Sequence, residues 1–579
     1  MNSKALYDFW MNSDYFDPDT KKELEQIRDM PDEIEERFYR DLEFGTGGLR
    51  GIIGAGTNRM NIYTVRKASK GLANYLNKNV KDAGKRGITI AYDSRHMSPR
   101  FAAEAAGIFA ANGIKAYLFD ELRPTPELSF AVRYLRAAAG VVVTASHNPK
   151  QYNGYKVYGE DGGQLPLDGS EAVFREIEGI ADLTDVKPMP QEEAAKNGLL
   201  AIIGKEVDDA YINSLKTLAV DPSAVAKAAD TMKIVYTPLH GSGNKPVRRI
   251  LKETGFKNVI VVPQQELPDP EFSTVKSPNP EEKDAFKLAI ELAEKEDVDL
   301  IIGTDPDSDR IGVVVRSSTG EYMVLTGNQT GCLLLEYILS QKKAAGNLPA
   351  NGFAVKTIVT SELARKIAAY YDIELIEVLT GFKFIGEKIK ELDETGKKKY
   401  LFGFEESYGY LAGTFARDKD AVVASMLIGE MAAWYRNRGM SLYEGLLELF
   451  EKYGYFIEGI TSFTLEGKEG IEKINSAMDS LRSRKSSAFA ACNVKAVRDY
   501  EQREIAELHT GIRKPLDLPV SNVLYYELAD GSWFCIRPSG TEPKIKVYYG
   551  VSESSMAKSR EKLEKIKEHV VGEIKQLLY

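Results

Sequence analysis

A run of alternating aspartates, DPDSDR at residues 305–310, directly follows the apolar segment 298–303. The proline in this run disfavours a helix, and on an extended backbone the residues at i, i+2 and i+4 lie on the same side. We therefore expect Asp305, Asp307 and Asp309 to converge on one cation. Carboxylate oxygens suit Mg²⁺ far better than Zn²⁺, so the run predicts a magnesium site.

An EF-hand and a solvated acidic loop are the alternatives for this run. The EF-hand does not fit, because the glycine that its calcium loop requires would be Arg310 and its final glutamate would be Arg316. An acidic loop without a ligand is disfavoured, because three carboxylates so close together repel one another unless a cation joins them.

A second polar loop, TASHNP at residues 144–149, follows the strand-like segment 141–143. Its small residues, hydroxyl, imidazole and Asn-Pro pair predict a sharp turn that presents Ser146 at the end of a strand. A plain strand-to-helix turn is the alternative. A Ser-His-Asp hydrolase is disfavoured, because the chain has no G-x-S-x-G motif and the side chains of Ser146 and His147 should point apart on an extended turn.

Two later loops carry further polar groups. In GFEESYG at 403–409, Glu405 and Ser407 can offer a carboxylate and a hydroxyl to the vicinal hydroxyls of a sugar, although a helix N-cap at Ser407 is an equally good interpretation. In RPSGTEP at 537–543, Arg537 with two hydroxyls, a glycine and backbone N–H groups predicts a phosphate cradle. A hairpin turn is the alternative there.

Together these loops supply a hydroxyl that can accept a phosphoryl group, a cation site, a sugar-binding pair and an anion clamp. These are the parts of phosphoryl transfer on a phosphosugar, a reaction that depends mainly on positioning and charge neutralisation. Neither G-x-x-x-x-G-K-[ST] nor G-x-G-x-x-G occurs in the chain. The sequence therefore gives no support to a kinase or a dehydrogenase.

The elements that must position these loops follow an alternating pattern. Short β-branched segments alternate with amphipathic ones, as in 87–92 followed by 99–112. This pattern is typical of βαβ units on a largely parallel sheet, and it predicts an α/β fold class. A helix expected over 281–296 leads into the strand 298–303, so the aspartates follow the carboxyl end of a strand, where open α/β sheets bind ligands.

The C-terminal part has a different pattern. Strands expected near 523–527 and 532–537 precede a helix at 556–578, without strict alternation. Such an order is typical of an α+β domain. Polar breaks place domain boundaries near residues 205, 320 and 456.

The composition excludes several classes of protein. With 579 residues, 43% of them hydrophobic, and 76 basic against 85 acidic residues for a net charge of −9, the chain is typical of a multidomain globular protein. The acidic balance argues against non-specific nucleic-acid binding, and no apolar stretch is long enough to span a membrane. Three scattered cysteines and no signal-peptide pattern lead us to expect a cytoplasmic location.

The four loops, in this order, resemble those of the α-D-phosphohexomutase superfamily over nearly the whole chain. TASHNP resembles its phosphoserine loop, DPDSDR its metal loop, GFEES its sugar loop and RPSGTEP its phosphate loop; FGTGGLRG (44–51), NGYK (153–156) and TGFK (380–383) also match. In its length and in the KDA segment at 419–421, the chain is most similar to the bacterial phosphoglucomutases, a branch close to the phosphopentomutases.

The resemblance implies three similar α/β domains with mixed sheets and a smaller α+β C-terminal domain around one central cleft. The expected domains are 1–205 with the phosphoserine loop, 206–320 with the metal loop, 321–456 with the sugar loop and 457–579 with the phosphate loop.

It also implies roles for individual residues. Ser146 would carry the phosphoryl group and complete an Mg²⁺ site with the three aspartates, Asp305, Asp307 and Asp309, and glucose 1,6-bisphosphate would be the activator. Lys156 would be the acid/base candidate, with its pKa lowered by Mg²⁺ and arginines; Arg50 would offset the phosphoserine charge and His147 would organise the loop. The substrate-binding residues would be Arg310, Thr380, Glu405, Ser407, Lys419, Arg537, Ser539, Gly540 and Thr541.

The implied activity is a phosphoglucomutase reaction, which interconverts glucose 1-phosphate and glucose 6-phosphate through a bisphosphate intermediate. A phosphopentomutase on the same site is the first alternative. A phosphomannomutase is disfavoured because Gly409 and Phe382 stand where some such members have histidine. A bisphosphate synthase or phosphatase, an amino-sugar mutase, and a non-catalytic phosphosugar-binding protein are the remaining alternatives. The expected partner is a small phosphosugar, with no nucleic acid and no membrane, and the chain is expected to be a monomer or homodimer.

Overall fold

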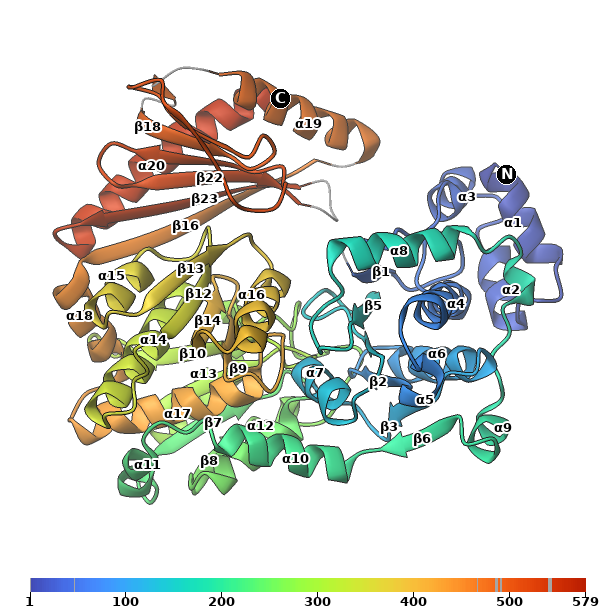
Figure 1. Ribbon diagram of the computed structural model, residues 1–579, viewed down its shortest axis with the longest axis horizontal. Coiled ribbons are helices and arrows are strands. Elements are labelled where there is room, and N and C mark those ends of the chain that lie inside the picture. Colours follow the sequence, from blue (N-terminus) through green and yellow to red (C-terminus); the bar gives the residue numbers. More distant parts are fainter. Residues whose placement is uncertain (1, 46, 466, 485–487, 490–491, 540–543) are drawn as a thin grey trace. The chain divides into compact units, whose positions relative to one another are not determined.

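The computed structural model describes residues 2–45, 47–465, 467–484, 488–489, 492–539 and 544–579. Figure 1 shows the helices and strands of the chain, which divides into two compact units. The first comprises residues 1–327, 385–403 and 407–442, and the second comprises residues 328–384, 404–406 and 443–579. Among the described helices, we find none whose length and apolarity would let it cross a bilayer.

Three short helices at the N-terminus build an aromatic cluster on a longer one. The helices are α1 (Ser3–Asn12), α2 (Pro18–Glu25), α3 (Pro31–Phe38) and α4 (Ile62–Asn79). Trp10 stacks on Phe16, with ring centroids 4.2 Å apart, and both meet the ring of Tyr63 on α4. These buried rings attach the N-terminal helices to the core of the first sheet.

The first sheet has six strands in the order β1-β5-β4-β2-β3-β6. Strands β2, β3, β4 and β6 run parallel, whereas β5 is antiparallel to both β4 and β1, so the sheet is mixed. Its strands are β1 (Gly48–Ile52), β2 (Ile88–Tyr92), β3 (Ala116–Phe119), β4 (Ala139–Val143), β5 (Tyr152–Tyr158) and β6 (Leu200–Ile203). Its remaining helices are α5 (Ala83–Arg86), α6 (Ser98–Ala111), α7 (Thr125–Tyr134), α8 (Leu167–Glu178), η1 (Leu183–Asp185) and α9 (Gln191–Lys196).

Helices cover both faces of this sheet. Ile88 and Ile90 of β2 belong to the same core as Phe101 of α6, on one face. Side chains alternate along a strand, and on the other face Gly140 lies so close to α7 that a Cβ there would be 2.6 Å from Val132 Cγ2. The close packing of α7 fixes the helix end that reaches the metal loop described below.

The second sheet has five strands in the order β11-β10-β9-β7-β8. Strands β7, β8 and β9 are parallel, and β9, β10 and β11 form an antiparallel meander. The elements are α10 (Lys205–Lys216), α11 (Pro222–Ala228), β7 (Lys233–Thr237), α12 (Asn244–Glu253), β8 (Asn258–Val261), η2 (Pro263–Gln265), η3 (Lys283–Phe286), α13 (Lys287–Glu296), β9 (Leu300–Thr304), β10 (Ile311–Arg316) and β11 (Tyr322–Val324). The single helix expected over 281–296 is therefore a 3₁₀ turn followed by α13.

A third sheet orders its strands β13-β12-β14-β15, with β12 and β13 parallel. Its elements are α14 (Gly327–Ala344), β12 (Gly352–Thr357), α15 (Leu363–Tyr370), β13 (Glu374–Val378), α16 (Phe382–Thr395), β14 (Lys399–Glu405), β15 (Gly409–Ala412), α17 (Ala421–Asn437) and α18 (Leu442–Tyr453). The alternating pattern predicts this α/β class, and the number of three such sheets is the one that the family resemblance implies.

The C-terminal sheet is antiparallel in every pairing that the described residues show. Its path is β16-β23-β22-β21-β18-β19-β20, with β17 beside β18. The strands are β16 (Tyr455–Thr464), β17 (Ala488–Phe489), β18 (Cys492–Asp499), β19 (Glu504–Glu507), β20 (Arg513–Pro515), β21 (Leu524–Leu528), β22 (Trp533–Pro538) and β23 (Lys544–Glu553); the helices are α19 (Gly467–Ser483) and α20 (Met556–Leu578). The expected α+β C-terminal domain is confirmed.

Helix α17 begins just after Asp420, a buried aspartate in the KDA segment at 419–421. The Asp420 carboxylate accepts hydrogen bonds from the backbone N–H groups of Val422 and Val423, at 2.8 and 2.9 Å, and from the Tyr211 hydroxyl at 2.8 Å. Burial raises the pKa of Asp420 from 3.8 to about 6, and the hydrogen bonds only partly offset this rise. The Glu127 carboxyl also lies close enough to interact electrostatically with Asp420.

We expect Asp420→Asn to stabilise the fold more at neutral pH than in acid. The folded chain holds the Asp420 proton more tightly than the unfolded chain, so ionisation destabilises the native state as pH rises from about 4 to about 6. Asparagine cannot ionise and still caps a helix. Relative to the parent, the free energy of unfolding should rise by about 2 to 3 kcal/mol between pH 4 and pH 7, as measured by urea titration. Asp221→Asn, at the N-cap of α11, is the control, and an equal pH response in both variants would contradict the expectation.

Candidate active site

Ser146 lies in the loop after β4, and its hydroxyl group is held between a carboxyl group and a guanidinium group. Ser146 Oγ donates a hydrogen bond to Asp305 Oδ2 at 2.7 Å and accepts one from Arg310 Nη1 at 2.9 Å. The residue is 2% exposed, and its φ of 51° places it in the left-handed region, which non-glycine residues seldom adopt. The predicted sharp turn therefore exists, and the structure brings its serine to the metal loop.

The orientation expected for His147 is wrong. The left-handed turn brings His147 Nδ1 to 3.3 Å from Ser146 Oγ, whereas an extended turn would have separated the two side chains. Arg310 Nη1 also meets His147 Nδ1, which must then accept the hydrogen bond. Burial and the nearby charges of Arg310 and Arg50 hold the pKa of His147 well below its usual range, so the imidazole is neutral. A neutral acceptor beside Arg310 is consistent with a role in organising the loop.

Arg95 holds the serine loop in place through hydrogen bonds to its backbone, a role that the sequence analysis does not assign to this residue. Its side chain is fully buried and donates to the backbone carbonyls of Pro149 at 3.0 Å and Tyr152 at 3.1 Å, and also to those of Ser146 and Asn148. Asp93 lies 3.2 Å from Arg95 Nε and accepts a hydrogen bond from Thr144 Oγ1. The only signal in the sequence was the short polar turn DSR after a strand.

Arg95→Lys should misplace this loop although it keeps the positive charge. A lysine ammonium cannot reproduce the planar fork that reaches four carbonyls at once. We expect a loss of about 1 to 2 kcal/mol in the free energy of unfolding and roughly a tenfold loss of kcat. Urea titration and initial rates measure the two effects. The control Arg100→Lys changes an exposed arginine, and similar losses in both variants would contradict the assignment.

The metal loop connects β9 to β10, and its backbone is a tight turn rather than the expected extended segment. The Ser308 N–H donates to Asp305 O at 2.9 Å, and Ser308 has a φ of 52°. The carboxylates nevertheless converge, with one oxygen each from Asp305, Asp307 and Asp309 within 4.8 Å of the others. Convergence is thus as predicted, but the folding of the turn, not strand alternation, produces it.

The donor set fits a hard divalent cation. All three carboxylates are buried, and Asp307 Oδ1 and Asp309 Oδ1 have no hydrogen-bond partner among the described residues. Buried carboxylate oxygens without partners carry a large desolvation cost that a bound cation offsets. Burial and the neighbouring Asp307 and Asp309 raise the pKa of Asp305 well above its usual range. An all-oxygen acidic site of this kind could hold a metal ion, and its ligands suit Mg²⁺.

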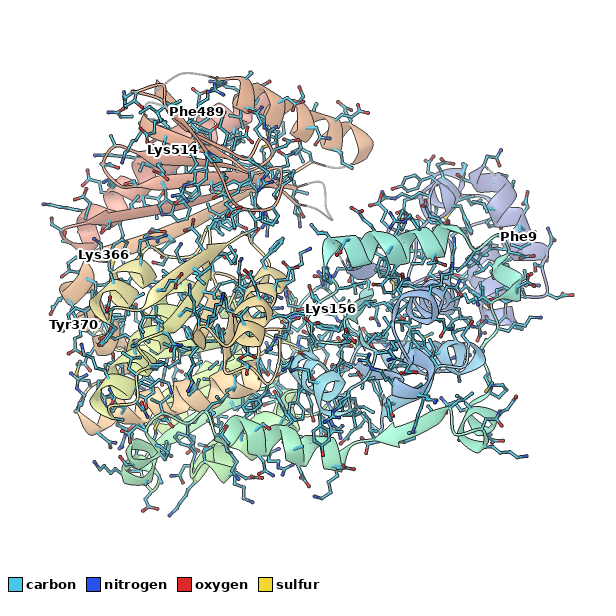
Figure 2. All side chains as sticks on the ribbon, in the orientation of Figure 1. Phe9, Lys156, Lys366, Tyr370, Phe489 and Lys514 are labelled. Carbon is cyan, nitrogen blue, oxygen red and sulfur yellow. The ribbon has the colours of Figure 1, made fainter. Side chains whose placement is uncertain are left out.

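Two lysines surround the same carboxylates. Lys156, labelled in Figure 2, lies on β5 with its Nζ 2.8 Å from Asp307 Oδ2 and 3.2 Å from Asp309 Oδ2. Lys419 Nζ lies 2.8 Å from the same oxygen of Asp309. Burial alone would lower the pKa of Lys156, but Asp307 and Asp309 raise it above its ordinary value. The lowered pKa expected for Lys156 is therefore not present in this arrangement.

The N-terminus of α7 also holds the metal loop. The Thr125 N–H donates to Asp307 O at 2.8 Å, and Thr125 Oγ1 donates to Asp307 Oδ2 at 2.9 Å. A helix N-terminus favours negative charge, so this position stabilises the carboxylate. The sequence analysis did not predict Thr125 as a site residue. Only its position in the segment TPE, at the start of a helix, could have indicated this role.

The sugar loop turns between β14 and β15. Ser407 O accepts a hydrogen bond from Arg310 Nε at 3.0 Å, which connects the loop to the serine and metal loops within the first unit. No helix begins at Ser407, so the N-cap alternative is wrong. Glu405, which is buried, and Thr380 after β13 belong to the second unit. Arg50 is on β1, opposite Gly154 of β5.

The phosphate loop follows β22 in the second unit. Arg537 is on β22 opposite Lys546 of β23, and the Ser539 N–H donates to Lys544 O at 2.7 Å. Strands β22 and β23 on either side of this loop are therefore an antiparallel pair, which agrees with the alternative of a hairpin turn. The predicted Gly540 and Thr541 lie outside the described residues.

The comparisons with known proteins place this chain in one family. Four family models match it in order: phosphoglucomutase/phosphomannomutase α/β/α domain I at residues 41–183, domain II at 209–320, domain III at 326–453 and the C-terminal domain at 483–571. A phosphoglucomutase of Staphylococcus haemolyticus is 41% identical over 520 residues, which cover 90% of this chain and 92% of that protein. This chain belongs to the phosphoglucomutase/phosphomannomutase family. A family member from Staphylococcus aureus strain MRSA252, also a phosphoglucomutase, is 40% identical over 89% of this chain and 91% of its own length.

Solved structures of the phosphoglucomutase/phosphomannomutase family have the same fold. A putative phosphomannomutase from Thermus thermophilus aligns with a TM-score of 0.67 at 22% identity, over 92% of this chain and 100% of its own. The open form of parafusin, a phosphoglucomutase from Paramecium, aligns with the same TM-score at 17% identity, over 93% of this chain and 96% of its own. The four-domain α/β architecture expected from the sequence is thus that of the family.

Proposed function

We propose that this chain is a phosphoglucomutase, which interconverts glucose 1-phosphate and glucose 6-phosphate with Ser146 as the phosphoryl carrier. The observation that carries the proposal is the position of Ser146 Oγ, between Asp305 at 2.7 Å and Arg310 at 2.9 Å. A buried hydroxyl at the edge of an acidic cation site, beside a fixed guanidinium, can hold a phosphoryl group. The relatives at about 40% identity carry the same activity in their names.

In the first half-reaction, phosphorylated Ser146 gives its phosphoryl group to the free hydroxyl of a bound glucose monophosphate. The bond between Oγ and phosphorus breaks, a new bond to the sugar oxygen forms, and the sugar hydroxyl loses its proton. Arg310, in contact with Oγ, would stabilise the charge on the transferring group, with Arg50 supporting it. The second half-reaction returns the other phosphate of the bisphosphate to Ser146, so either monophosphate can be the product.

Lys156 is the candidate that accepts or returns the sugar proton. Its ammonium group lies against Asp307 and Asp309, so it can act as a base only after another positive charge has taken over those carboxylates. Mg²⁺, when held by Asp305, Asp307, Asp309 and Ser146, would supply that charge and neutralise part of the phosphate. Glu405, Ser407, Thr380 and Lys419 would bind sugar hydroxyls, and Arg537 with Ser539, Gly540 and Thr541 would bind the phosphate that does not react.

The same proposal includes the organisation and location of the enzyme. The domain limits 1–205, 206–320, 321–456 and 457–579 are supported by the breaks between the matching family models, at 183–209, 320–326 and 453–483. A cytoplasmic location is supported by Cys332, Cys492 and Cys535, which are buried free thiols. Glucose 1,6-bisphosphate would prime Ser146 as activator.

The test is the initial rate on glucose 1-phosphate, with Mg²⁺ and a trace of glucose 1,6-bisphosphate, beside ribose 1-phosphate and mannose 1-phosphate. We expect kcat/KM for glucose 1-phosphate to exceed the others at least tenfold, or about 1.4 kcal/mol in transition-state binding. A higher rate on ribose 1-phosphate would replace the proposal with a phosphopentomutase. Activity on none of the three sugars would contradict the assignment of a mutase.

A further inference from the structure

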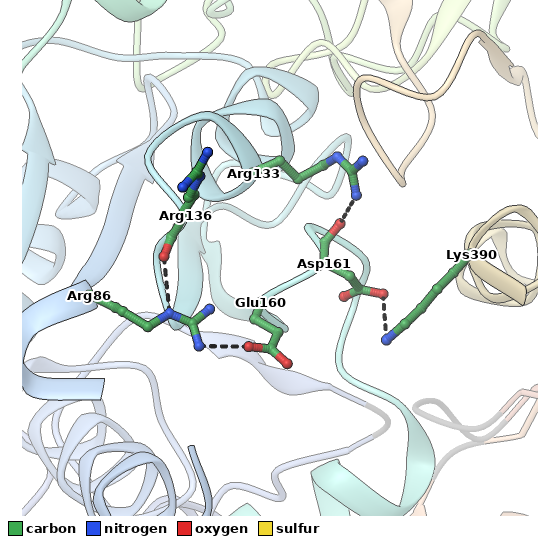
Figure 3. A pocket seen from close by; sticks show the side chains of 6 residues that line it. All are labelled: Arg86, Arg133, Arg136, Glu160, Asp161 and Lys390. Carbon is green, nitrogen blue, oxygen red and sulfur yellow. Dashed lines mark hydrogen bonds and ion pairs between the residues drawn. The ribbon is translucent and has the colours of Figure 1, made fainter. Parts of the chain in front are cut away.

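A depression on the first unit gathers four basic side chains around two acidic ones. Arg86, Arg133, Arg136, Lys390, Glu160 and Asp161 line a cavity of about 620 Å³ (Figure 3). This volume is within the range of small-molecule sites. None of these residues is among those assigned above to the serine, metal, sugar or phosphate loops.

The ion pairs within this depression leave two guanidinium groups uncompensated. Arg86 Nη1 pairs with Glu160 Oε2 at 2.7 Å, and Lys390 Nζ pairs with Asp161 Oδ2 at 3.2 Å (Figure 3). Over the described parts of the chain, neither Arg133 nor Arg136 forms an ion pair with a carboxylate. The lining therefore has a net charge of about +2, which matches a phosphate dianion.

The backbone holds the guanidinium group of Arg133 and fixes the main-chain position of Arg136. Arg133 Nη1 donates to Asp161 O at 2.9 Å, and the stem of Arg133 packs so closely on Gly162 that a Cβ there would be 3.1 Å from Arg133 Cδ. Arg136 has a φ of 53°, in the left-handed position after a helix where glycine is usual, and its carbonyl accepts a hydrogen bond from Arg86 Nε at 3.1 Å. The Arg133 guanidinium, fixed in this way, loses little freedom on binding a phosphate.

We propose that this depression is a second anion site, which binds a phosphate or pyrophosphate group of a small molecule apart from Ser146. Arg133 and Arg136 would contact the phosphate oxygens directly, while Arg86 and Lys390 remain paired with Glu160 and Asp161. Planar forks of N–H groups favour phosphate oxygens in bidentate geometry, which gives the site its preference.

The depression lies at the far ends of two elements that also serve the catalytic site. Strand β5 carries Lys156 and leads to Glu160 and Asp161, and helix α7 begins at Thr125 and ends beside Arg133 and Arg136. A ligand here would therefore contact the same two elements through residues other than those assigned to sugar binding. Binding of a ligand in the depression can therefore be measured in the absence of the catalysed reaction.

Pyrophosphate is the probe, and calorimetry measures its binding without Mg²⁺ at constant ionic strength. The protein is the full chain carrying Arg537→Ala, a change that weakens binding at the phosphate loop. We expect the added pair Arg133→Ala and Arg136→Ala to weaken pyrophosphate binding at least tenfold. The matched control is Arg175→Ala, an exposed arginine of α8 outside the depression, and it should change binding less than twofold. Equal affinities with and without the two arginines would overturn the proposal.

A gain of affinity separates a binding role from a folding defect. Glu160→Gln removes a negative charge from the lining and releases Arg86, so pyrophosphate should bind several-fold more tightly, whereas Glu171→Gln on α8 should have no effect. No increase with Glu160→Gln, or citrate binding as tight as pyrophosphate binding, would overturn the phosphate assignment. In the chain with Arg537 intact, the two arginine variants should keep kcat/KM for glucose 1-phosphate within twofold, so the outcome is independent of the catalytic proposal.

Discussion

Ser146→Ala should lower kcat/KM for glucose 1-phosphate at least about 10³-fold, which corresponds to about 4 kcal/mol of transition-state stabilisation. The change removes the oxygen that carries the phosphoryl group between the two half-reactions, and no other hydroxyl among the described residues contacts both Asp305 and Arg310. Initial rates measure the loss. Mass spectrometry of the intact protein after incubation with glucose 1,6-bisphosphate should show one added phosphoryl group on the parent and none on the variant.

The control for this experiment lies in the same region. Ser277 Oγ donates to His147 O at 3.1 Å, so Ser277→Ala removes a serine hydroxyl that supports the loop without reaching the reacting oxygen. We expect Ser277→Ala to retain activity within a few-fold. Circular dichroism should show that both variants are folded. Residual activity of Ser146→Ala within tenfold of the parent, or a phosphoryl group on another residue, would refute Ser146 as the carrier.

Asp307→Asn should abolish the response of the protein to Mg²⁺. The carboxylate is buried, one of its oxygens has no hydrogen-bond partner among the described residues, and the other contacts Thr125 and Lys156. An amide of the same shape retains the Thr125 contact but loses the charge that binds a cation. We expect at least about a 10²-fold loss of kcat, or about 2.7 kcal/mol.

Thermal unfolding distinguishes loss of the metal from loss of the fold. For the parent, Mg²⁺ at 100 times its dissociation constant should stabilise the native state by about 2.7 kcal/mol, and EDTA should remove this gain. For Asp307→Asn the melting temperature should be the same with Mg²⁺ and with EDTA. Asp297→Asn is the control, since it removes an exposed aspartate just before β9. A parent protein without any Mg²⁺ stabilisation, or a variant that retains it, would contradict the metal assignment.

The fold class could be predicted because it depends on local patterns. The β-branched segment at 87–92 became β2, the amphipathic segment at 99–112 became α6, and the expected final helix is α20 at Met556–Leu578. Hydrophobic periodicity records which face of an element is buried, and this is a property of neighbouring residues. The antiparallel partners β5 and β10 were not predicted individually, since strand direction depends on which segments pair across the sheet.

The site was predicted by residue type more accurately than by geometry. The aspartates at 305, 307 and 309 converge, but on a tight turn closed by the Ser308 N–H rather than on an extended strand. His147 lies beside Ser146 because the serine adopts a left-handed φ, which the letters TASHNP do not specify. Arg95 and Thr125 were missed because each acts through backbone or carboxylate contacts made far away in sequence.

The sequence by itself determined the chemistry available to this protein: a serine hydroxyl, three carboxylates in a short run, basic residues and a loop of Arg, Ser, Gly and Thr, in an order typical of phosphohexomutases. Types and spacings suffice for this because acidity, charge and hydrogen-bonding capacity belong to each side chain. Only the tertiary structure decided that Ser146, 159 residues before Asp305, donates to it, and that Lys156 and Lys419 share Asp309. Such contacts arise when sheets and helices pack their buried faces, and no local pattern records the distance between segments that packing brings together.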